Sequence, residues 1–151
     1  MNKNENGYSI LAPDYGKNPL TDNTEDLCAA LIIQLEQGMI LHSVGLEGEL
    51  VSYLDKIVCH KGVLDTDKIY MERTKGYKKS DSGWYIGAVE GTEPSEELEA
   101  FYAFQVIKLR PSIIKVLALP SGYLAVFNGD ELEAVINEQN EEIYKYVAEQ
   151  A

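Results

Sequence analysis

The segment from Asp81 to Ala100 constrains the fold most strongly. It opens with an Asp-Ser-Gly turn at residues 81–83, where the Asp and Ser side chains can bond the backbone and Gly tolerates a positive φ. Residues 84–89 then alternate two sets of side chains with a period of two, which predicts a β-strand. Pro94 ends this strand, because proline cannot donate a ladder hydrogen bond. The turn and the proline together fix the limits of the strand.

Three further segments carry the same strand pattern. They are residues 56–60, 68–74 and 123–127. Short turns join the first two of them to each other and to the strand at 84–89. Consecutive strands with short connections predict an antiparallel meander.

Helical spacing of apolar residues appears in three places. Residues 22–38 begin with a pattern typical of a capping box and end at Gly38, and their wide apolar stripe predicts a helix buried on much of its circumference. Residues 97–109 are apolar on most sides and are also predicted to be helical, with Pro111 opening a further turn. Residues 129–150 place apolar side chains on one stripe and glutamates on the opposite face, which predicts a long amphipathic helix.

These elements define an α+β fold class. We expect a mostly antiparallel sheet of about four to five strands packed against helices, with a long C-terminal amphipathic helix. The chain has 151 residues, and neither an internal repeat nor a linker-like tract is visible in it. Residues 1–151 are therefore predicted to form a single domain.

The net charge of −12 narrows the choice of partners. Residues 1–79 carry nine basic and twelve acidic side chains, a net charge of −3, whereas residues 80–151 carry four and thirteen, a net charge of −9. A negative field repels nucleic acid and anionic membranes, and it accelerates encounter with a basic protein. The same charge also keeps a protein soluble, so charge alone does not distinguish these two roles.

No catalytic or cofactor-binding motif is found in the sequence. The P-loop, dinucleotide-binding, zinc-protease and nucleophile-elbow patterns are all missing, and His42 and His60 are the only imidazoles. Cys59 and His60 are adjacent in a predicted strand, so they would point to opposite faces and could not share a metal ion. We therefore expect neither an enzyme nor a cofactor or metal site.

The expected location is the cytoplasm. No run of eighteen apolar residues is present, and the polar start of the chain leads into no hydrophobic signal core. Cys28 and Cys59 lie in apolar helical and strand-like runs, where buried free thiols usually occur in a reducing compartment.

The candidate binding residues lie around the acidic stretch, in which five glutamates fall between residues 90 and 99 without a lysine or arginine. One interpretation is a solvated loop and first helical turn. The sharper interpretation is an anionic face beside an exposed aromatic side chain, which suits a basic partner. Trp84 is expected in the core instead. The residues assigned to this face are Tyr85, Glu90, Glu93, Glu96 and Glu97.

Residues 57–127 resemble the bacterial immunity protein 33 family through the order and spacing of several short motifs. The loop after Arg73 departs from the family pattern because it is rich in lysine. The resemblance does not cover residues 1–55, which are predicted to form a helix-containing extension. It also does not cover residues 129–150, which are predicted to form the C-terminal helix. The matching motifs are Met71-Glu72-Arg73, Asp81-Ser82-Gly83-Trp84, Pro111-Ser112-Ile113-Ile114, Leu117 and Pro120-Ser121-Gly122.

The resemblance implies a protein that is encoded beside a polymorphic toxin, binds that toxin in the cytosol and blocks it sterically. It implies no reaction and offers no catalytic residues. Two alternatives from other classes stay open: an acidic cytosolic binding or regulatory module without a toxin partner, and a small carboxylate-based hydrolase. The identity of the toxin and the oligomeric state do not follow from the sequence.

Overall fold

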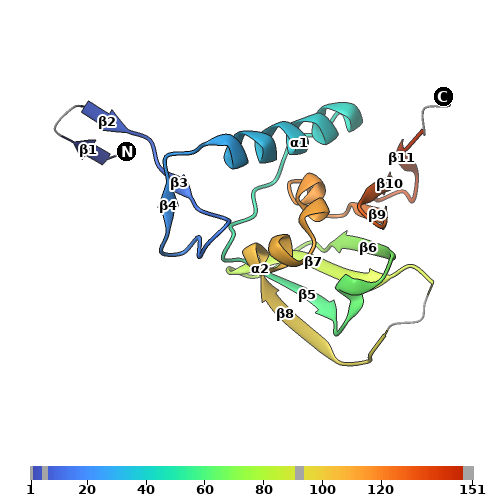
Figure 1. Ribbon diagram of the computed structural model, residues 1–151. Coiled ribbons are helices and arrows are strands. Elements are labelled where there is room, and N and C mark those ends of the chain that lie inside the picture. The colour runs from blue at the N-terminus through green and yellow to red at the C-terminus, as the bar shows by residue number, and fades with distance from the viewer. Residues whose placement is uncertain (1, 5–6, 91–93, 148–151) are drawn as a thin grey trace.

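Seven strands form one mixed sheet in the computed structural model, which describes residues 2–4, 7–90 and 94–147 (Figure 1). The strand order is β11-β10-β9-β6-β7-β5-β8. In chain order these strands are β5 (Lys56–His60), β6 (Lys68–Arg73), β7 (Asp81–Ala88), β8 (Leu98–Tyr102), β9 (Leu124–Asn128), β10 (Glu131–Ile136) and β11 (Glu142–Lys145).

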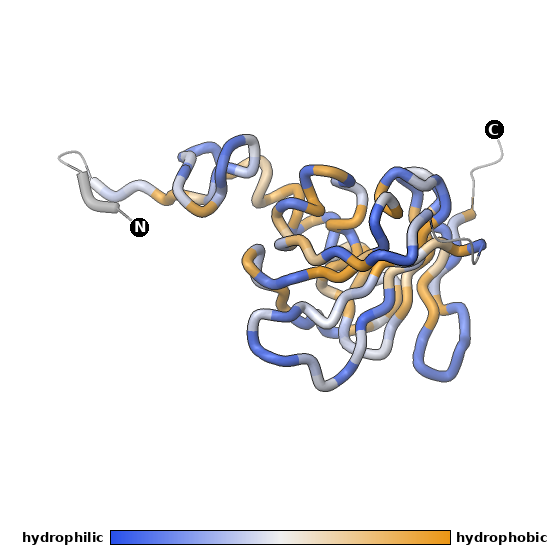
Figure 2. Tube along the Cα trace, turned by 90° about the horizontal axis from the view of Figure 1, so that it is seen from below, coloured by the Kyte–Doolittle hydropathy of each residue, from blue (hydrophilic) through white to orange (hydrophobic). Residues whose placement is uncertain are grey.

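The helices lie on one side of this sheet (Figure 1). They are α1 (Cys28–Val44), α2 (Ala103–Leu109) and the 3-10 helix η2 (Pro111–Val116), while the 3-10 helix η1 (Val63–Asp65) lies in the connection from β5 to β6. Two small sheets precede α1: β1 (Asn2–Asn4) pairs with β2 (Gly7–Ser9), and β3 (Ala12–Pro13) pairs with β4 (Asn23–Thr24). This N-terminal segment extends away from the large sheet (Figures 1 and 2).

The hydrophobic core lies between the sheet and α2 with η2. Strands β5, β6, β7, β9 and β10 contribute buried side chains to it, and the tryptophan expected in the core is 1% exposed. Pro111 opens η2 as predicted, because its missing donor would have no partner in a first turn. The largest core side chains are Trp84, Phe127, Ile57, Ile69, Met71, Ile86, Ile113 and Leu119.

The predicted meander is wrong in its order. The four predicted strands exist, but β7 lies between β6 and β5, and it pairs with β5 in parallel, with Val58 opposite Tyr85 and Cys59 opposite Ile86. The sheet is therefore mixed, with more strands than the four to five that we expected. The reason is that β5 pairs with β7 and β8, both of which lie further along the chain, and short connections alone do not reveal such pairing.

The predicted helix at residues 97–109 begins six residues too early. Residues 98–102 form β8 and pair along the whole of β5, from Lys56 opposite Tyr102 to His60 opposite Leu98. Helix α2 starts only after this pairing ends, where the Tyr102 N–H donates to the Gln105 side chain at 2.9 Å. Tertiary pairing overrides the local helical pattern here.

The predicted C-terminal helix at 129–150 is also wrong, because β10 and β11 form a hairpin there. The Asn137 side chain accepts hydrogen bonds from the N–H groups of Gln139 and Glu141, and Asn140 adopts a left-handed φ of 64°. These contacts form a turn that interrupts any helix, since Asn tolerates that conformation and favours side-chain bonding to nearby backbone. Val135 is then buried opposite Ala125 of β9.

Helix α1 differs from its prediction in position and in burial. It spans Cys28–Val44, so Gly38 lies inside it, and it ends at Gly45, whose φ of 68° is the left-handed conformation typical of a helix stop. At the start, Asp26 accepts a hydrogen bond from the Cys28 N–H at 2.9 Å. None of its residues is buried, although we expected burial on much of its circumference. Cys28 is exposed, and Cys59 is buried as expected.

Arg73 at the end of β6 connects the sheet to two loops. Its side chain is fully buried, and its Nε donates to the Ser82 carbonyl at 3.0 Å. One terminal nitrogen donates to the carbonyls of Glu49 at 2.9 Å and Leu119 at 2.8 Å, and the other donates to Leu50 at 3.2 Å. The guanidinium therefore holds the segment after α1 and the segment after η2 against the same strand.

The Glu49 carboxylate adds to the hydrogen bonds that Arg73 makes with these loops. It accepts hydrogen bonds from the Tyr77 hydroxyl and from the backbone and hydroxyl of Ser121, and it lies 3.8 Å from the Arg73 guanidinium. A second buried arginine, Arg110, donates to four carbonyls around the turn before β6 and the β9–β10 turn, at 2.5 to 3.1 Å. The central strand is thus tied near both of its ends.

We expect Arg73→Met to lower the free energy of unfolding by about 3–5 kcal/mol, because the carbonyls and the Glu49 carboxylate lose a buried donor. Arg73→Lys keeps the charge but cannot form the forked set of bonds, so it should also destabilise. Chemical denaturation measures the effect. Lys79→Met, at an exposed position, is the control and should change stability by less than about 0.5 kcal/mol. Equal stability of Arg73→Met and Lys79→Met would contradict the role of Arg73.

Glu49 should make stability depend on pH. Desolvation raises the pKa of this carboxyl, but the hydrogen bonds from Tyr77 and Ser121 and the charge of Arg73 outweigh it, so the pKa lies below its ordinary value of 4.5. A lowered folded-state pKa contributes stability above the unfolded-state pKa, and this contribution is lost as the pH falls through the folded-state value. Glu49→Gln should therefore be less stable than wild type near pH 7, with the difference shrinking below about pH 4. Urea denaturation across pH tests this, with Glu47→Gln as the matched control, and a constant difference would contradict it.

Candidate functional site

The second face of the large sheet is not covered by any helix of the described residues (Figure 1). Its side chains alternate with the core residues; those in the middle are half-buried, whereas Lys68 and Glu72 of β6 are exposed. A sheet face turned to water usually carries polar residues, but here aromatic and aliphatic side chains occupy the middle strands. These side chains are Val58, His60, Tyr70, Tyr85, Leu124 and Val126.

Three rings form a row across this face, each from a different strand. His60 of β5 meets Tyr85 of β7 edge-on, with ring centroids 5.7 Å apart. Tyr85 in turn lies 6.0 Å from Tyr70 of β6. The order β6-β7-β5 places these rings side by side, and we call His60, Tyr85 and Tyr70 the aromatic row.

Gly87 makes space for the aromatic row. A Cβ atom at this position would lie 2.6–2.7 Å from two ring carbons and the hydroxyl oxygen of Tyr70, so the Tyr70 side chain lies directly over the glycine. Glycine inside a strand often marks such a close approach. The absence of a side chain at residue 87 therefore sets the position of Tyr70 beside Tyr85.

The acidic segment lies at one end of the aromatic row. The ring Nδ1 of His60 is 2.9 Å from the Ser95 carbonyl oxygen. The Lys61 backbone donates to the Glu97 carbonyl at 2.9 Å, and the Lys61 ammonium forms an ion pair with the Glu97 carboxylate at 3.1 Å. These contacts fix residues 95–97 to the end of β5, so a polar, acidic rim adjoins the aromatic face.

The predicted site residues are only partly brought together. Tyr85 lies in the aromatic row, and Glu96 and Glu97 are exposed on the rim. Glu90 is exposed just after β7 and lines a separate hollow of about 380 Å³ with Lys68 and Asn128. Glu93 lies outside the described residues. Trp84 faces the core as predicted, and its ring N–H donates to the Leu117 carbonyl at 3.1 Å.

His60 and Tyr70 were missed as candidates. The sequence held a signal for Tyr70, because in the predicted strand at 68–74 Ile69 and Met71 share one face and Tyr70 must then point the other way. The contact between His60 and Tyr85 depends on the parallel pairing of β5 with β7, which the local pattern does not show.

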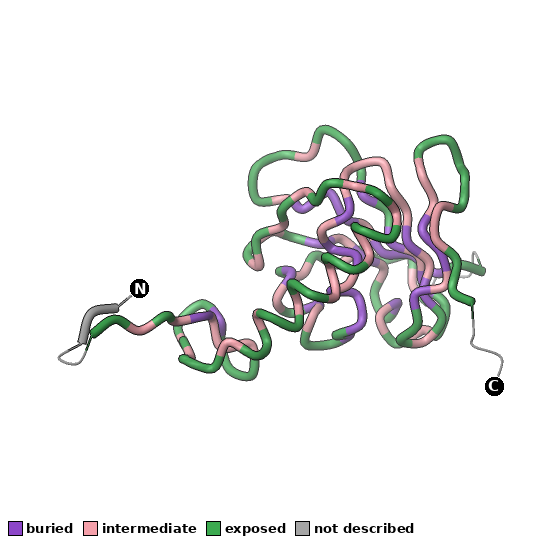
Figure 3. The backbone as a smooth tube through the Cα atoms, turned by 90° about the horizontal axis from the view of Figure 1, so that it is seen from above, coloured by how far each residue is buried: buried purple, intermediate pink, exposed green. Residues whose placement is uncertain are grey.

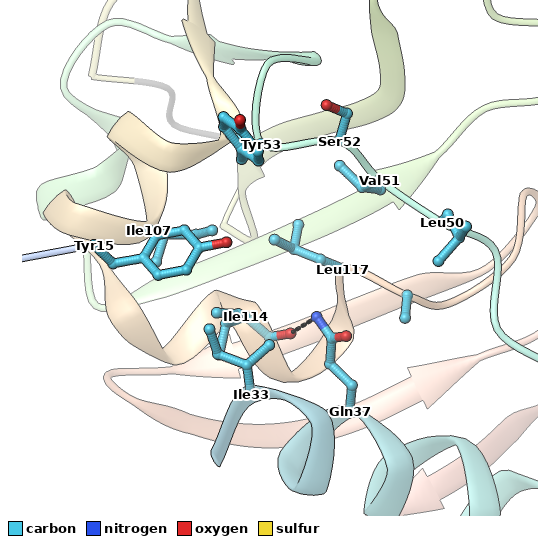
Figure 4. A pocket seen from close by; sticks show the side chains of 12 residues that line it. Tyr15, Ile33, Gln37, Leu50, Val51, Ser52, Tyr53, Ile107, Ile114 and Leu117 are labelled. Atoms are coloured by element: carbon cyan, nitrogen blue, oxygen red, sulfur yellow. Dashed lines mark hydrogen bonds between the residues drawn. The ribbon is translucent and has the colours of Figure 1, made fainter. Parts of the chain in front are cut away.

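A cleft of about 350 Å³ lies under α1 (Figure 4). It is enclosed by α1, η2, α2 and residues 50–53, and the Gln37 side chain donates to the Ile114 carbonyl at 2.9 Å across its floor. Burial, and then the nearby Tyr53, raise the pKa of the Tyr15 hydroxyl. The described lining carries no carboxyl, imidazole or thiol group, so it offers no acid–base pair.

Within residues 7–90 and 94–147, no three His, Cys, Asp or Glu side chains come together as metal ligands. None of the helices in the described part of the chain is both long and apolar enough to cross a membrane.

The open sheet face, the aromatic row and the acidic rim are together the features of a protein that binds a partner on a surface. Comparison with protein families identifies it further: the model of the Imm33-like domain matches residues 36–138, more than half of the chain. The chain belongs to the Imm33-like domain family. This confirms the resemblance found over residues 57–127 and extends it to the second half of α1 and to β10. The chain matches no curated protein and no solved structure significantly.

We expect Gly87→Ala to displace the Tyr70 ring without unfolding the sheet, because the added methyl occupies the space of a side chain that can turn towards water. Contacts between the Tyr70 and Tyr85 rings, measured by NMR, should be lost, while the free energy of unfolding changes by about 1–3 kcal/mol. Ser95→Ala is the control outside the strands and should preserve the ring contacts. Unchanged ring contacts in Gly87→Ala would contradict this packing.

Proposed function

We propose that this chain is an immunity-type protein that binds a cognate protein toxin and neutralises it by covering the toxin's functional surface. The uncovered sheet face with its aromatic row and acidic rim carries the proposal. Membership of the Imm33-like domain family supports the immunity role.

The aromatic row supplies the centre of the proposed interface. Tyrosine is enriched at protein interfaces because it buries a large ring while its hydroxyl finds a polar partner. Tyr70 and Tyr85 are half-buried, so their rings are already ordered before binding. Pre-ordered side chains lose little conformational entropy when a partner covers them.

The acidic rim supplies attraction over a longer range. The net charge of −12 favours a basic partner, and Glu96 and Glu97 lie where such a partner would approach the aromatic row. Opposite charge raises the rate of association and excludes partners of like charge. Rapid binding suits a protein that must inactivate a toxin before it acts.

Inhibition by occlusion requires no reaction. The sheet face presents an extended surface instead of a deep, polar cavity, and an extended surface can cover a toxin's substrate site. We therefore place this chain among binding proteins, acting in the cytoplasm where the toxin would act.

The function is tested by co-expressing the chain with the toxin domain encoded beside its gene. We expect growth to be rescued and a stable complex to be purified. A neighbouring toxin that kills equally well with or without the chain, and that does not bind it, would overturn the proposal.

The acidic rim is tested by measuring association rates with that toxin domain. Glu96→Lys with Glu97→Lys should slow association by about ten-fold at low salt and less at high salt. Glu141→Lys with Glu142→Lys, on the hairpin at the far edge of the sheet, is the matched control: it makes the same change in net charge and also breaks one exposed ion pair.

The two double variants separate local steering from overall charge. If both variants slow association equally, net charge alone explains the effect, and the proposed role of the acidic rim is contradicted. In the same experiment, Tyr85→Ala should mainly raise the dissociation rate, because it removes a central contact and leaves the charges in place.

A further inference from the structure

Helix α1 is apolar on two opposite sides, and the fold uses only one of them. The side facing the body is half-buried against η2 and the neighbouring segments. With 3.6 residues per turn, its side chains fall within an arc of about 100°. They are Ala30, Ile33, Gln37, Ile40, Leu41 and Val44.

The other side of α1 is exposed to solvent (Figure 3). Its large side chains are Leu31, Ile32, Leu35 and Met39, with exposed fractions of 59%, 55%, 65% and 70%. A helix that is apolar all round is normally buried, so this exposure requires an explanation. We call these four residues, with Cys28 and His42 at the two ends, the outer seam.

The outer seam has the spacing of a helix–helix interface. Cys28, Ile32, Leu35, Met39 and His42 follow one another at intervals of four, three, four and three residues, the alternation that places side chains along a coiled-coil seam. The seam is also symmetric in position about Leu35, because Leu31 and Met39 lie four residues, and Cys28 and His42 seven residues, on either side of it. Two antiparallel copies would set Leu35 against Leu35, Leu31 against Met39, and Cys28 against His42.

Charge is compatible with pairing of two copies along this seam. Although the whole chain carries −12, no acidic residue occupies a seam position, so the negative groups do not meet there. Helix α1 also lacks lysine and arginine. A helix that binds anionic membrane surfaces typically carries both on its polar face, so a membrane suits α1 less well than another apolar helix.

We propose that the outer seam is a self-association surface, in which α1 of two copies pair antiparallel around a two-fold axis at Leu35. Such an isologous contact uses the same surface on both copies and closes after two. Gly38 lies beside the seam, and a Cβ atom placed there would meet no neighbouring segment within 4 Å. The open space at this glycine lets the two helices approach closely.

The available area predicts a weak dimer. Complete burial of a Leu, Ile or Met side chain removes on the order of 100 Å² from water, so the four exposed side chains offer roughly 250 Å² per copy. Two copies bury about 500 Å² of apolar side chain, below the 1,200–2,000 Å² of total surface in a typical stable complex. The dimer should therefore be reversible, with a dissociation constant on the order of 100 µM.

This surface is separate from the proposed toxin-binding face. Helix α1 lies on the helix-covered side of the sheet, so a dimer through α1 leaves both aromatic rows accessible (Figure 1). The matched family domain begins at residue 36, so four of the six seam residues, from Cys28 to Leu35, lie outside it. The dimer does not depend on the immunity role and can be tested without a toxin.

Sedimentation of the full chain from about 1 to about 500 µM tests self-association. We expect the mean mass to rise reversibly towards that of a dimer. Leu35→Glu with Met39→Glu should be monomeric throughout, because the two-fold axis then brings like charges together. Leu98→Glu with Leu109→Glu, at exposed apolar positions on β8 and at the end of α2, adds the same charge and should dimerise as wild type does. Circular dichroism checks that each variant is folded.

Cysteine cross-linking tests the antiparallel geometry. His42→Cys should form a disulfide-linked dimer under mild oxidation, because residue 42 meets Cys28 of the second copy, and adding Cys28→Ser should abolish it. The wild type should not cross-link, since two Cys28 residues would lie about 21 Å apart along the helices. A monomer at every concentration would overturn the proposal, and so would cross-linking of the wild type through Cys28, which requires parallel helices.

Discussion

The fold depends on a buried cation whose partners are mainly backbone carbonyls. Arg73 is planar and always charged, so it can satisfy several carbonyl oxygens at once where a lysine could not. Its partners belong to the segment after α1, the segment after η2 and β7. Arg110 acts similarly on the turns around the other end of β6. These two side chains hold loops that have little regular structure against the middle of the sheet, and the shape of both sheet faces follows from that.

The open sheet face and the exposed side of α1 both result from the two-layer architecture. A single layer of helices covers a single sheet, so each layer keeps an outer surface. On the sheet this surface carries aromatic rings beside an acidic rim, which suits a basic protein. On α1 it carries aliphatic side chains without charge, which suits a similar helix. The chemical difference between the two surfaces keeps the proposed toxin-binding site separate from the proposed self-association surface.

The sequence predicted local structure better than pairing. The four strands at 56–60, 68–74, 84–89 and 123–127 follow from alternation, and the burial of Trp84 follows from its size. Alternation cannot reveal that β7 pairs in parallel with β5, because that choice depends on residues far apart in the chain. The C-terminal hairpin was missed because the apolar residues of segment 129–150 recur at helical spacing. The signal against a helix was Asn140, a residue type that tolerates the left-handed conformation of a turn. Tyr85 and the rim glutamates were predicted, but His60 and Tyr70 join them only through the strand order.

The parallel pairing of β5 with β7 has a consequence for the growing chain on the ribosome. β5 is synthesised first among the strands of the large sheet, yet both of its neighbours, β7 and β8, are synthesised later. Until residue 102 is available, β5 exposes unpaired backbone groups and can pair wrongly with β6, the next strand to appear. The hairpin of β6 with β7 has no such delay, because its strands follow each other directly. Pairing of β5 with β8 therefore waits until residue 102 is synthesised, and pairing of β6 with β9 waits until residue 128.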